Sequence, residues 1–273
     1  MNRLQATDLG LAALAIVTLA AGGLAASGAS FASASQTSAP SSSSATTTEA
    51  ASSDASPSTS ASASSTSSSS SASKVAVETL PNSEAADLVV LGDASSNETG
   101  EWVNELGAQI GETRLVRVKR VNQQTFSAYN APITYGTADP SLQVWNASVE
   151  DPQPLDSTSV KNLVAKSTDL VLISQGRGAD ANSITADLNE TLSTLQAAYP
   201  DLPVAVVIQP DDGSSSKAIA AVTDWASQNG LAIIDVAKAF SKSSANLQDS
   251  DGVLTTRGTV LWAQRVANAI TQS

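Results

Sequence analysis

The sequence predicts one three-layer α/β/α domain with a mostly parallel sheet, preceded by an N-terminal hydrophobic helix and a disordered linker. Continuous apolar runs predict strands that are buried on both faces. These runs alternate with stretches of helical periodicity, which is typical of a doubly wound sheet. Residues 75–273 are enough for one domain with a sizeable core. We expect strands near residues 87–91, 114–121, 142–145, 170–173, 204–208 and 232–235.

Residues 1–32 have the features of an export signal. Arg3 precedes an uncharged run from Leu9 to Ala26, and small residues that include Ala32-Ser33-Ala34 follow it. The run is long for a cleavable hydrophobic region and about long enough to cross a bilayer. A cleaved signal peptide and a retained membrane anchor both remain open. Either one predicts an extracytoplasmic domain, anchored to the membrane or secreted into the cell envelope.

Residues 33–74 consist almost entirely of Ser, Ala and Thr, with no aliphatic residue larger than alanine. Such a segment cannot bury enough apolar surface to offset the entropy lost on ordering. It is therefore expected to be a disordered tether between the N-terminal segment and the folded domain. The composition changes at about Val75, where apolar strands and amphipathic helices begin.

Apolar residues at helical spacing mark the expected helices between the strands. Pro200 follows one of these helical stretches and Gly230 follows another. Proline ends a helix because it lacks a backbone N–H, and glycine ends one because it readily adopts the left-handed conformation. Trp102 and Trp262 each begin such a face, so we expect both to pack in the core. The faces comprise Trp102, Leu106 and Ile110; Ile184, Leu188, Leu192 and Leu195; Ile219, Val222 and Trp225; and Trp262, Val266 and Ile270.

Composition excludes several classes of function. The chain has a formal net charge of −12, nearly all of it on residues 75–273, which makes nucleic acid and anionic lipid poor partners. It contains no cysteine and no histidine, so it has no disulfide, and a zinc site is not expected. We expect no metal and no cofactor. Without imidazole, a Ser-His catalytic mechanism is excluded whatever the fold.

One basic cluster stands out in this acidic domain. Arg114, Arg117, Lys119 and Arg120 alternate partly with apolar residues in a strand pattern. We interpret the cluster as the solvated side or edge of a strand rather than as a binding patch.

The first of four short segments combines a strand with a tight turn. Residues 88–91 are followed by Gly92-Asp93-Ala94-Ser95, and then by Asn97, Glu101, Trp102 and Val103 in the spacing Asn-x-x-x-Glu-Trp-Val. This segment resembles the first sequence block of the SGNH (GDSL-type) hydrolases, in an actinobacterial esterase branch. In that family the position of Ala94 carries the nucleophilic serine.

Three further segments resemble the other blocks of this family, in the same order. Residues 144–148 are similar to the second block, without the glycine that normally follows. In the third, Gly176-Arg177-Gly178, Gly178 stands in place of the asparagine whose amide would hold the oxyanion. In the last, Asp251-Gly252-Val253-Leu254 retains Asp251 but carries Leu254 in place of histidine. The resemblance spans roughly residues 86–270 and implies the flavodoxin-like SGNH hydrolase fold.

Loops at the carboxyl ends of the strands of such a sheet gather into one crevice. The resemblance implies that the turn after residue 91 and the loops near residues 146, 175–178 and 251–254 meet there. We expect a polar pocket able to bind a hydroxylated ligand. Its candidate residues are Asp93, Ser95, Ser96, Asn146, Gln175, Arg177, Asp180 and Asp251.

Two functions follow from these observations. The first is a pseudo-enzyme, which is an SGNH-like domain without catalysis that binds an envelope glycan, an acylated envelope component or a partner protein. The alternative is an ester hydrolase or acyltransferase for carbohydrate or lipid esters that uses non-standard residues. Ser95 with Asp251 as base would be one such pair. An unperturbed carboxylate has a pKa of about 4 and is a weak base toward serine, so we expect the first function.

Overall fold

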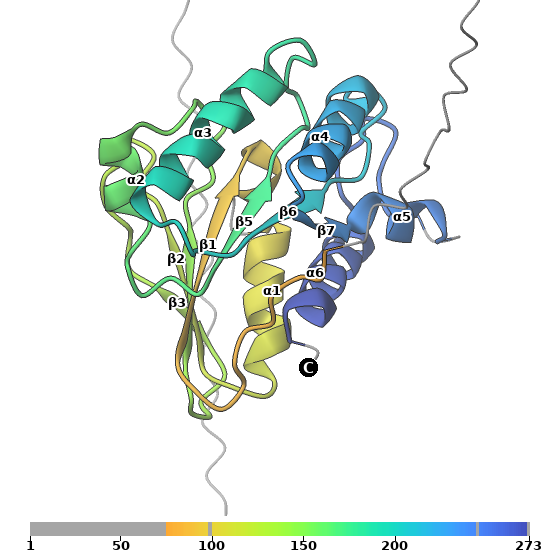
Figure 1. The fold of residues 1–273 in the computed structure, drawn as a ribbon. Helices are drawn as coiled ribbons and strands as arrows, with labels where there is room; N and C mark the ends of the chain where they lie inside the picture. The colour runs from red at the N-terminus through yellow and green to blue at the C-terminus, as the bar shows by residue number, and fades with distance from the viewer. Residues whose placement is uncertain (1–74, 98–99, 244–245, 272–273) are drawn as a thin grey trace, which may run out of the picture. The chain divides into compact units, whose positions relative to one another are not determined.

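The computed structural model describes residues 75–97, 100–243 and 246–271 (Figure 1). The expected N-terminal helix and linker, and the expected boundaries after residues 32 and 74, lie outside this part of the chain. Within the described ranges, no helix is both long enough and apolar enough to span a bilayer.

A seven-stranded sheet lies between two layers of helices, which confirms the expected α/β/α fold (Figure 1). The strand order is β3-β2-β4-β1-β5-β6-β7, and every pairing is parallel except that of β2 with β3. The strands are β1 (Ala86–Gly92), β2 (Val116–Arg120), β3 (Ile133–Tyr135), β4 (Leu142–Asn146), β5 (Leu170–Ser174), β6 (Val204–Ile208) and β7 (Ala232–Asp235).

Six of these strands lie where the apolar runs predicted them, and β3 was not predicted. It has three residues, of which Ile133 and Thr134 are exposed, so it carries no buried apolar run. It forms an antiparallel edge beside β2. A short edge strand buries little surface and leaves little signal in a sequence.

Alternate residues of β1 face opposite layers of helices, as expected for the pleat of a strand. Leu88 and Val90 belong to the core under α1, α5 and α6, whereas Val89 and Leu91 belong to the core under α2, α3 and α4. Both faces are buried, which explains why β1 is a continuous apolar run. The helices are α1 (Trp102–Gly111), α2 (Ser157–Leu163), α3 (Ile184–Ala198), α4 (Ser216–Gln228), α5 (Val236–Ser241) and α6 (Thr256–Thr271).

Trp102 and Trp262 join α1 to α6, and their expected place in the core is confirmed. Their rings are stacked with centroids 5.5 Å apart and an interplanar angle of 6°. Neither side chain is exposed to solvent. The indole Nε1 of Trp102 donates a 2.8 Å hydrogen bond to Ser96 Oγ, which connects this stack to the turn after β1.

The interpretation of the basic cluster as a solvated side or edge of a strand was wrong for Arg114. Its side chain is only 4% exposed. Its guanidinium donates to the carbonyl oxygens of Pro81, Glu84, Pro140 and Ser141 at 2.8–3.0 Å. A buried charge is tolerated when its donors are satisfied in this way. Four carbonyl acceptors from two segments distant in sequence therefore meet at one side chain.

We expect Arg114→Met to destabilise the domain by about 3 kcal/mol, because it leaves buried carbonyl groups without donors. Urea unfolding followed by circular dichroism measures the change. Arg117→Met is the matched control. That side chain is half-buried in the adjacent strand, and a change below about 1 kcal/mol is expected. Equal losses in the two variants would contradict a special role for Arg114.

Candidate functional site

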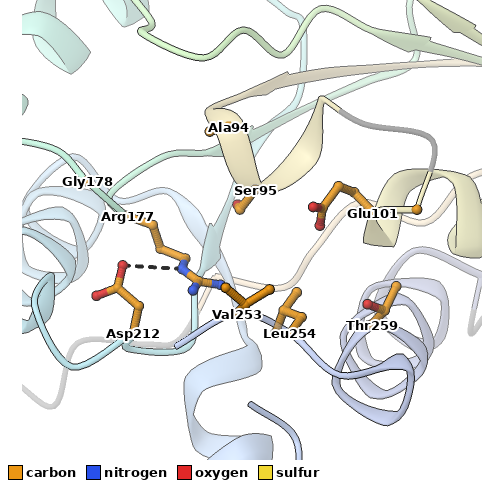
Figure 2. A pocket seen from close by; sticks show the side chains of 10 residues that line it. Ala94, Ser95, Glu101, Arg177, Gly178, Asp212, Val253, Leu254 and Thr259 are labelled. Atoms are coloured by element: carbon orange, nitrogen blue, oxygen red, sulfur yellow. Dashed lines mark ion pairs between the residues drawn. The ribbon is translucent and has the colours of Figure 1, made fainter. Parts of the chain in front are cut away.

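A pocket of about 350 Å³ opens where the loops after β1, β5 and β6 meet the start of α6 (Figure 2). Ligand sites of open α/β sheets form at this end because loops from neighbouring parallel strands converge there. The lining residues are Ala94, Ser95, Gly100, Glu101, Arg177, Gly178, Asp212, Val253, Leu254 and Thr259.

The turn after β1 places Ser95 on the pocket wall and Asp93 behind it. Asp93 caps the short helix η1 (Ala94–Ser96), since its Oδ1 accepts the backbone N–H of Ser95 at 3.1 Å. The same Oδ1 accepts the hydroxyl of Ser95 at 2.6 Å. A short O–H···O⁻ distance of this kind is typical of a charge-assisted hydrogen bond. Ser95 is half-exposed, whereas Asp93 is 2% exposed.

The second carboxylate oxygen of Asp93 is held by the loop after β5 and by a side chain after β6. Oδ2 accepts the backbone N–H of Gly176 at 3.1 Å, that of Arg177 at 3.2 Å and Nε2 of Gln209 at 3.0 Å. Burial raises the pKa of Asp93, and the hydrogen bonds it accepts only partly offset this effect. A raised pKa makes this carboxylate a stronger base than a solvated one.

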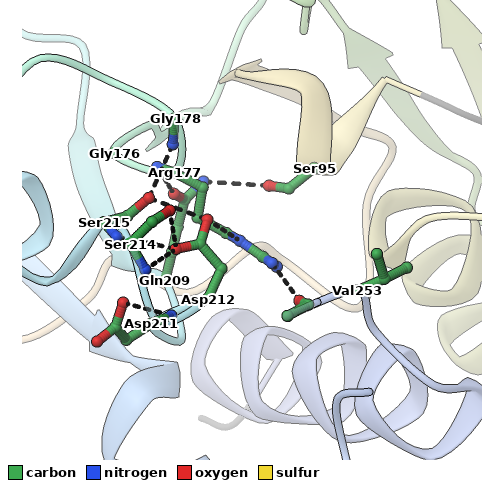
Figure 3. A network of polar contacts seen from close by, with 12 residues as sticks. Ser95, Gly176, Arg177, Gly178, Gln209, Asp211, Asp212, Ser214, Ser215 and Val253 are labelled. Carbon is green, nitrogen blue, oxygen red and sulfur yellow. Dashed lines mark hydrogen bonds and ion pairs between the residues drawn. The ribbon is translucent and has the colours of Figure 1, made fainter. Parts of the chain in front are cut away.

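Gln209 connects the parts of this network (Figure 3). Its Nε2 donates to Asp93, to the carbonyl oxygen of Ser174 at 2.9 Å and to Ser95 Oγ at 3.3 Å. Its Oε1 accepts the backbone N–H of Arg177 at 2.8 Å. We did not predict Gln209. The sequence marks Gln209 only as a polar residue directly after a buried strand, which is also how it marks Asp93 after β1.

Arg177 and Asp212 form the charged side of the pocket. Arg177 Nε lies 3.6 Å from Asp212 Oδ2, and Nη2 donates to the carbonyl oxygen of Gly252. Partial burial by itself would raise the pKa of Asp212. The hydrogen bonds from Ser214 and Ser215 outweigh this and lower the pKa to about 2. Asp212 is therefore ionised across the physiological range and is a weak base.

The three positions that the resemblance marked as altered, Ala94, Gly178 and Leu254, line this one pocket. The four loops were expected to converge, and three of them do so here. Ser95 and Arg177 are the predicted polar residues on the lining, and Asp93 lies directly behind Ser95. Asp212, Glu101 and Thr259 also line the pocket and were missed. Glu101 and Thr259 lie at the starts of helices, whereas the candidate residues were chosen from loops that follow strands.

Other predicted pocket residues lie elsewhere. Ser96 and Asn146 are fully buried, and Asn146 Nδ2 donates to the carbonyl oxygen of Ser96 at 2.6 Å, so they hold loops together instead of facing a ligand. Asp180 is exposed and accepts hydrogen bonds from Asn182. Gln175 is half-buried and is not among the lining residues.

Asp251 does not supply the carboxylate of this site. It is exposed in a turn, where its backbone N–H donates to Asp249 Oδ1. The aspartate on the pocket wall is Asp212, and the one paired with Ser95 is Asp93. Among the residues with described positions, no cluster of three or more carboxylates is placed to hold a metal ion.

No protein-family profile matches this sequence, and no curated protein matches it. Solved structures do. A peptidoglycan O-acetylesterase matches with a TM-score of 0.51 at 9% identity, over 68% of this chain and 91% of its own. A family 3 carbohydrate esterase from Clostridium thermocellum matches with a TM-score of 0.48 at 13% identity, over 68% and 95%.

A lipolytic protein of the G-D-S-L family from Desulfitobacterium hafniense DCB-2 matches with a TM-score of 0.47 at 13% identity, over 67% of this chain and 99% of its own. The domain has the fold of the SGNH hydrolases, as the sequence blocks implied. Our expectation of a domain that is not an enzyme is corrected here: the fold is shared with a peptidoglycan O-acetylesterase, and nothing in the comparisons supports an inactive domain.

Proposed function

We propose that this domain is an ester hydrolase or acyltransferase in which Ser95 is the nucleophile and Asp93 is its base. The observation that carries the proposal is the 2.6 Å hydrogen bond from Ser95 Oγ to Asp93 Oδ1 at the wall of the pocket. A serine hydroxyl needs an adjacent base to become nucleophilic. Asp93 is suited to that task because burial raises its pKa. Carbohydrate or lipid esters of the cell envelope are the proposed substrates.

In the first half of the reaction, Ser95 Oγ attacks the carbonyl carbon of the ester while its proton moves to Asp93 Oδ1. The carbonyl oxygen becomes an oxyanion. When the C–O bond to the alcohol breaks, the oxyanion reforms the carbonyl and the proton moves from Asp93 to the departing oxygen. The products of this half are the free alcohol and an acyl ester on Ser95.

Arg177 is the group that we assign to stabilise the oxyanion. Its guanidinium brings positive charge into the pocket, and its position is fixed by Asp212 and by the carbonyl of Gly252. Donors held in place before the reaction stabilise developing charge without reorganisation. The amide N–H of Gly178 is less suited to this role, because it donates to Ser215 Oγ at 2.9 Å.

The second half requires a base for the attacking water, and we assign this role to Glu101. Asp93 is 2% exposed and lies behind the lining, so its carboxylate is less accessible to a water in the pocket than that of Glu101. Asp212 has a pKa of about 2 and is a weak base. Glu101 lines the pocket, and Figure 2 shows its carboxylate directed toward Ser95. Water loses a proton to Glu101 as it attacks the acyl carbon, and Ser95 Oγ recovers a proton from Glu101 as the acyl group leaves.

We expect Glu101→Gln to slow deacylation about tenfold to a hundredfold, the low end of the usual contribution of a general base. The acyl group should then accumulate on Ser95, which mass spectrometry of the intact protein and its peptides detects. Glu105→Gln is the matched control, since Glu105 lies on the next turn of α1 and does not line this pocket. Unchanged turnover in Glu101→Gln would remove Glu101 from the mechanism.

The proposed function is tested by hydrolysis of aryl esters and of acetylated sugars by the purified protein. Turnover is expected to be slow, because loss of triad members typically lowers kcat by a factor on the order of 10⁴ to 10⁶. Turnover must nevertheless exceed that of Ser95→Ala. A wild-type rate equal to that of this variant, with every ester tested, would contradict the proposal.

A further inference from the structure

Large apolar side chains are exposed at only four described positions, and one of them faces the pocket. These are Val75, Ile133, Val253 and Val260, and Val253 is the most exposed at 59%. Val253 lines the pocket together with Leu254 and Ala94. Single exposed apolar residues are ordinary on a protein surface. Three apolar residues that line one pocket together with Ser95 call for an explanation from the ligand.

The exposure of Val253 is imposed by a fixed loop. The backbone N–H of Val253 donates to Asp249 Oδ1, and its carbonyl accepts the backbone N–H of Asp249, both at 2.9 Å. The preceding residue, Gly252, has a positive φ of 77° and lies so close to the backbone of Asp212 that a Cβ would collide with it. Arg177 holds the carbonyl of Gly252. The loop therefore presents Val253 to the pocket at a defined position.

Leu254 is anchored from behind. It packs against the core under α1, α5 and α6, and a Cβ at Gly258 would lie 3.2 Å from its Cδ2. Its remaining surface faces the pocket. In the view of Figure 2, Ser95 lies between Ala94 and the pair formed by Val253 and Leu254. Because these four residues line one pocket, an ester carbonyl placed at Ser95 Oγ would share that pocket with the apolar side chains.

We propose that Val253 and Leu254 bind the alkyl part of the acyl group, so that the site takes acyl chains longer than acetyl. This inference rests on the proposed function, because it places the ester carbonyl at Ser95. The charged residues of the lining are Arg177, Asp212 and Glu101. The large apolar residues of the lining are Val253 and Leu254, so the alkyl chain is assigned to them. A volume of about 350 Å³ is in the range of small-ligand pockets and accommodates a chain of several carbons.

The kinetic test is the dependence of kcat/KM on chain length with p-nitrophenyl esters from acetyl to octanoyl. A methylene that leaves water contributes up to about 0.8 kcal/mol, or about a fourfold gain. We expect a twofold to fourfold rise for each added methylene until the pocket is filled. Val253→Ser should flatten this dependence while leaving the fold intact, since its side chain is exposed. Val260→Ser, an exposed valine that does not line this pocket, should leave it unchanged.

A second measurement does not require catalysis. Straight-chain methyl ketones from butanone to decanone carry the same carbonyl but cannot be hydrolysed, and their binding is followed by calorimetry. Affinity should rise with chain length in the wild type and in Ser95→Ala. Turnover that is fastest with acetyl esters, with no gain in ketone affinity, would overturn this inference and leave the proposed function standing. Ketone affinity that rises with chain length, without turnover of any ester, would overturn the proposed function alone.

Discussion

Replacing Ser95 with alanine is expected to lower kcat/KM for ester hydrolysis at least about 10³-fold. The side chain removed is the nucleophile itself, and the donors to the Asp93 carboxylate include no other hydroxyl of the pocket lining. Loss of a nucleophile typically costs three to six orders of magnitude. A continuous assay with a p-nitrophenyl ester measures the change. A fluorophosphonate probe should label the wild type at Ser95 and leave the variant unlabelled.

Ser227→Ala is the matched control for this experiment. Ser227 lies on α4, is exposed and donates to the carbonyl oxygen of Thr223 within its own helix. This variant should keep the full wild-type rate. If Ser95→Ala retained wild-type turnover, or if the probe labelled a different residue, Ser95 would not be the nucleophile.

Asp93→Asn is expected to produce a comparable loss, about 10³-fold in kcat/KM, because an amide cannot accept the proton of Ser95. The wild type should also show an acid limb in its pH–rate profile. Asp93 must be ionised to act as a base, and burial raises its pKa above the ordinary value of 3.8. Activity should therefore rise with pH through a midpoint above 3.8. This limb should be absent from any residual activity of Asp93→Asn.

The fold should survive this substitution, which separates catalysis from unfolding. Burial raises the pKa of Asp93 in the folded state, so ionising this carboxylate lowers the stability of the fold. The loss begins as pH rises above the pKa that Asp93 has in the unfolded chain. Asparagine carries no charge, so it removes that cost, but it keeps one acceptor oxygen and replaces the other with a donor, so a modest loss of stability with the fold retained is expected. The Tm at pH 7 checks this point. Asp87→Asn, at the opposite end of β1, is the control and should keep full activity. Wild-type activity in Asp93→Asn would rule out Asp93 as the base.

The sequence predicted the architecture because the forces behind it leave a local pattern. A strand buried on both faces must be apolar at consecutive positions, and a helix packed on a sheet must be apolar at every third or fourth position. These patterns located six strands and the helices with Trp102 and Trp262. They failed at β3, which buries little, and at Arg114, whose carbonyl acceptors come from elsewhere in the chain.

The sequence by itself also determined that no Ser-His mechanism operates, since the chain contains no histidine. It did not determine which carboxylate meets which hydroxyl. Asp251, chosen from a motif position, lies in an exposed turn, whereas Asp93 meets Ser95 and also Gln209, 116 residues away. Only the tertiary structure decided that Asp93 is buried, and therefore that its pKa is raised. Burial and the partners of a charged group depend on segments far apart in the chain, and no local periodicity records them.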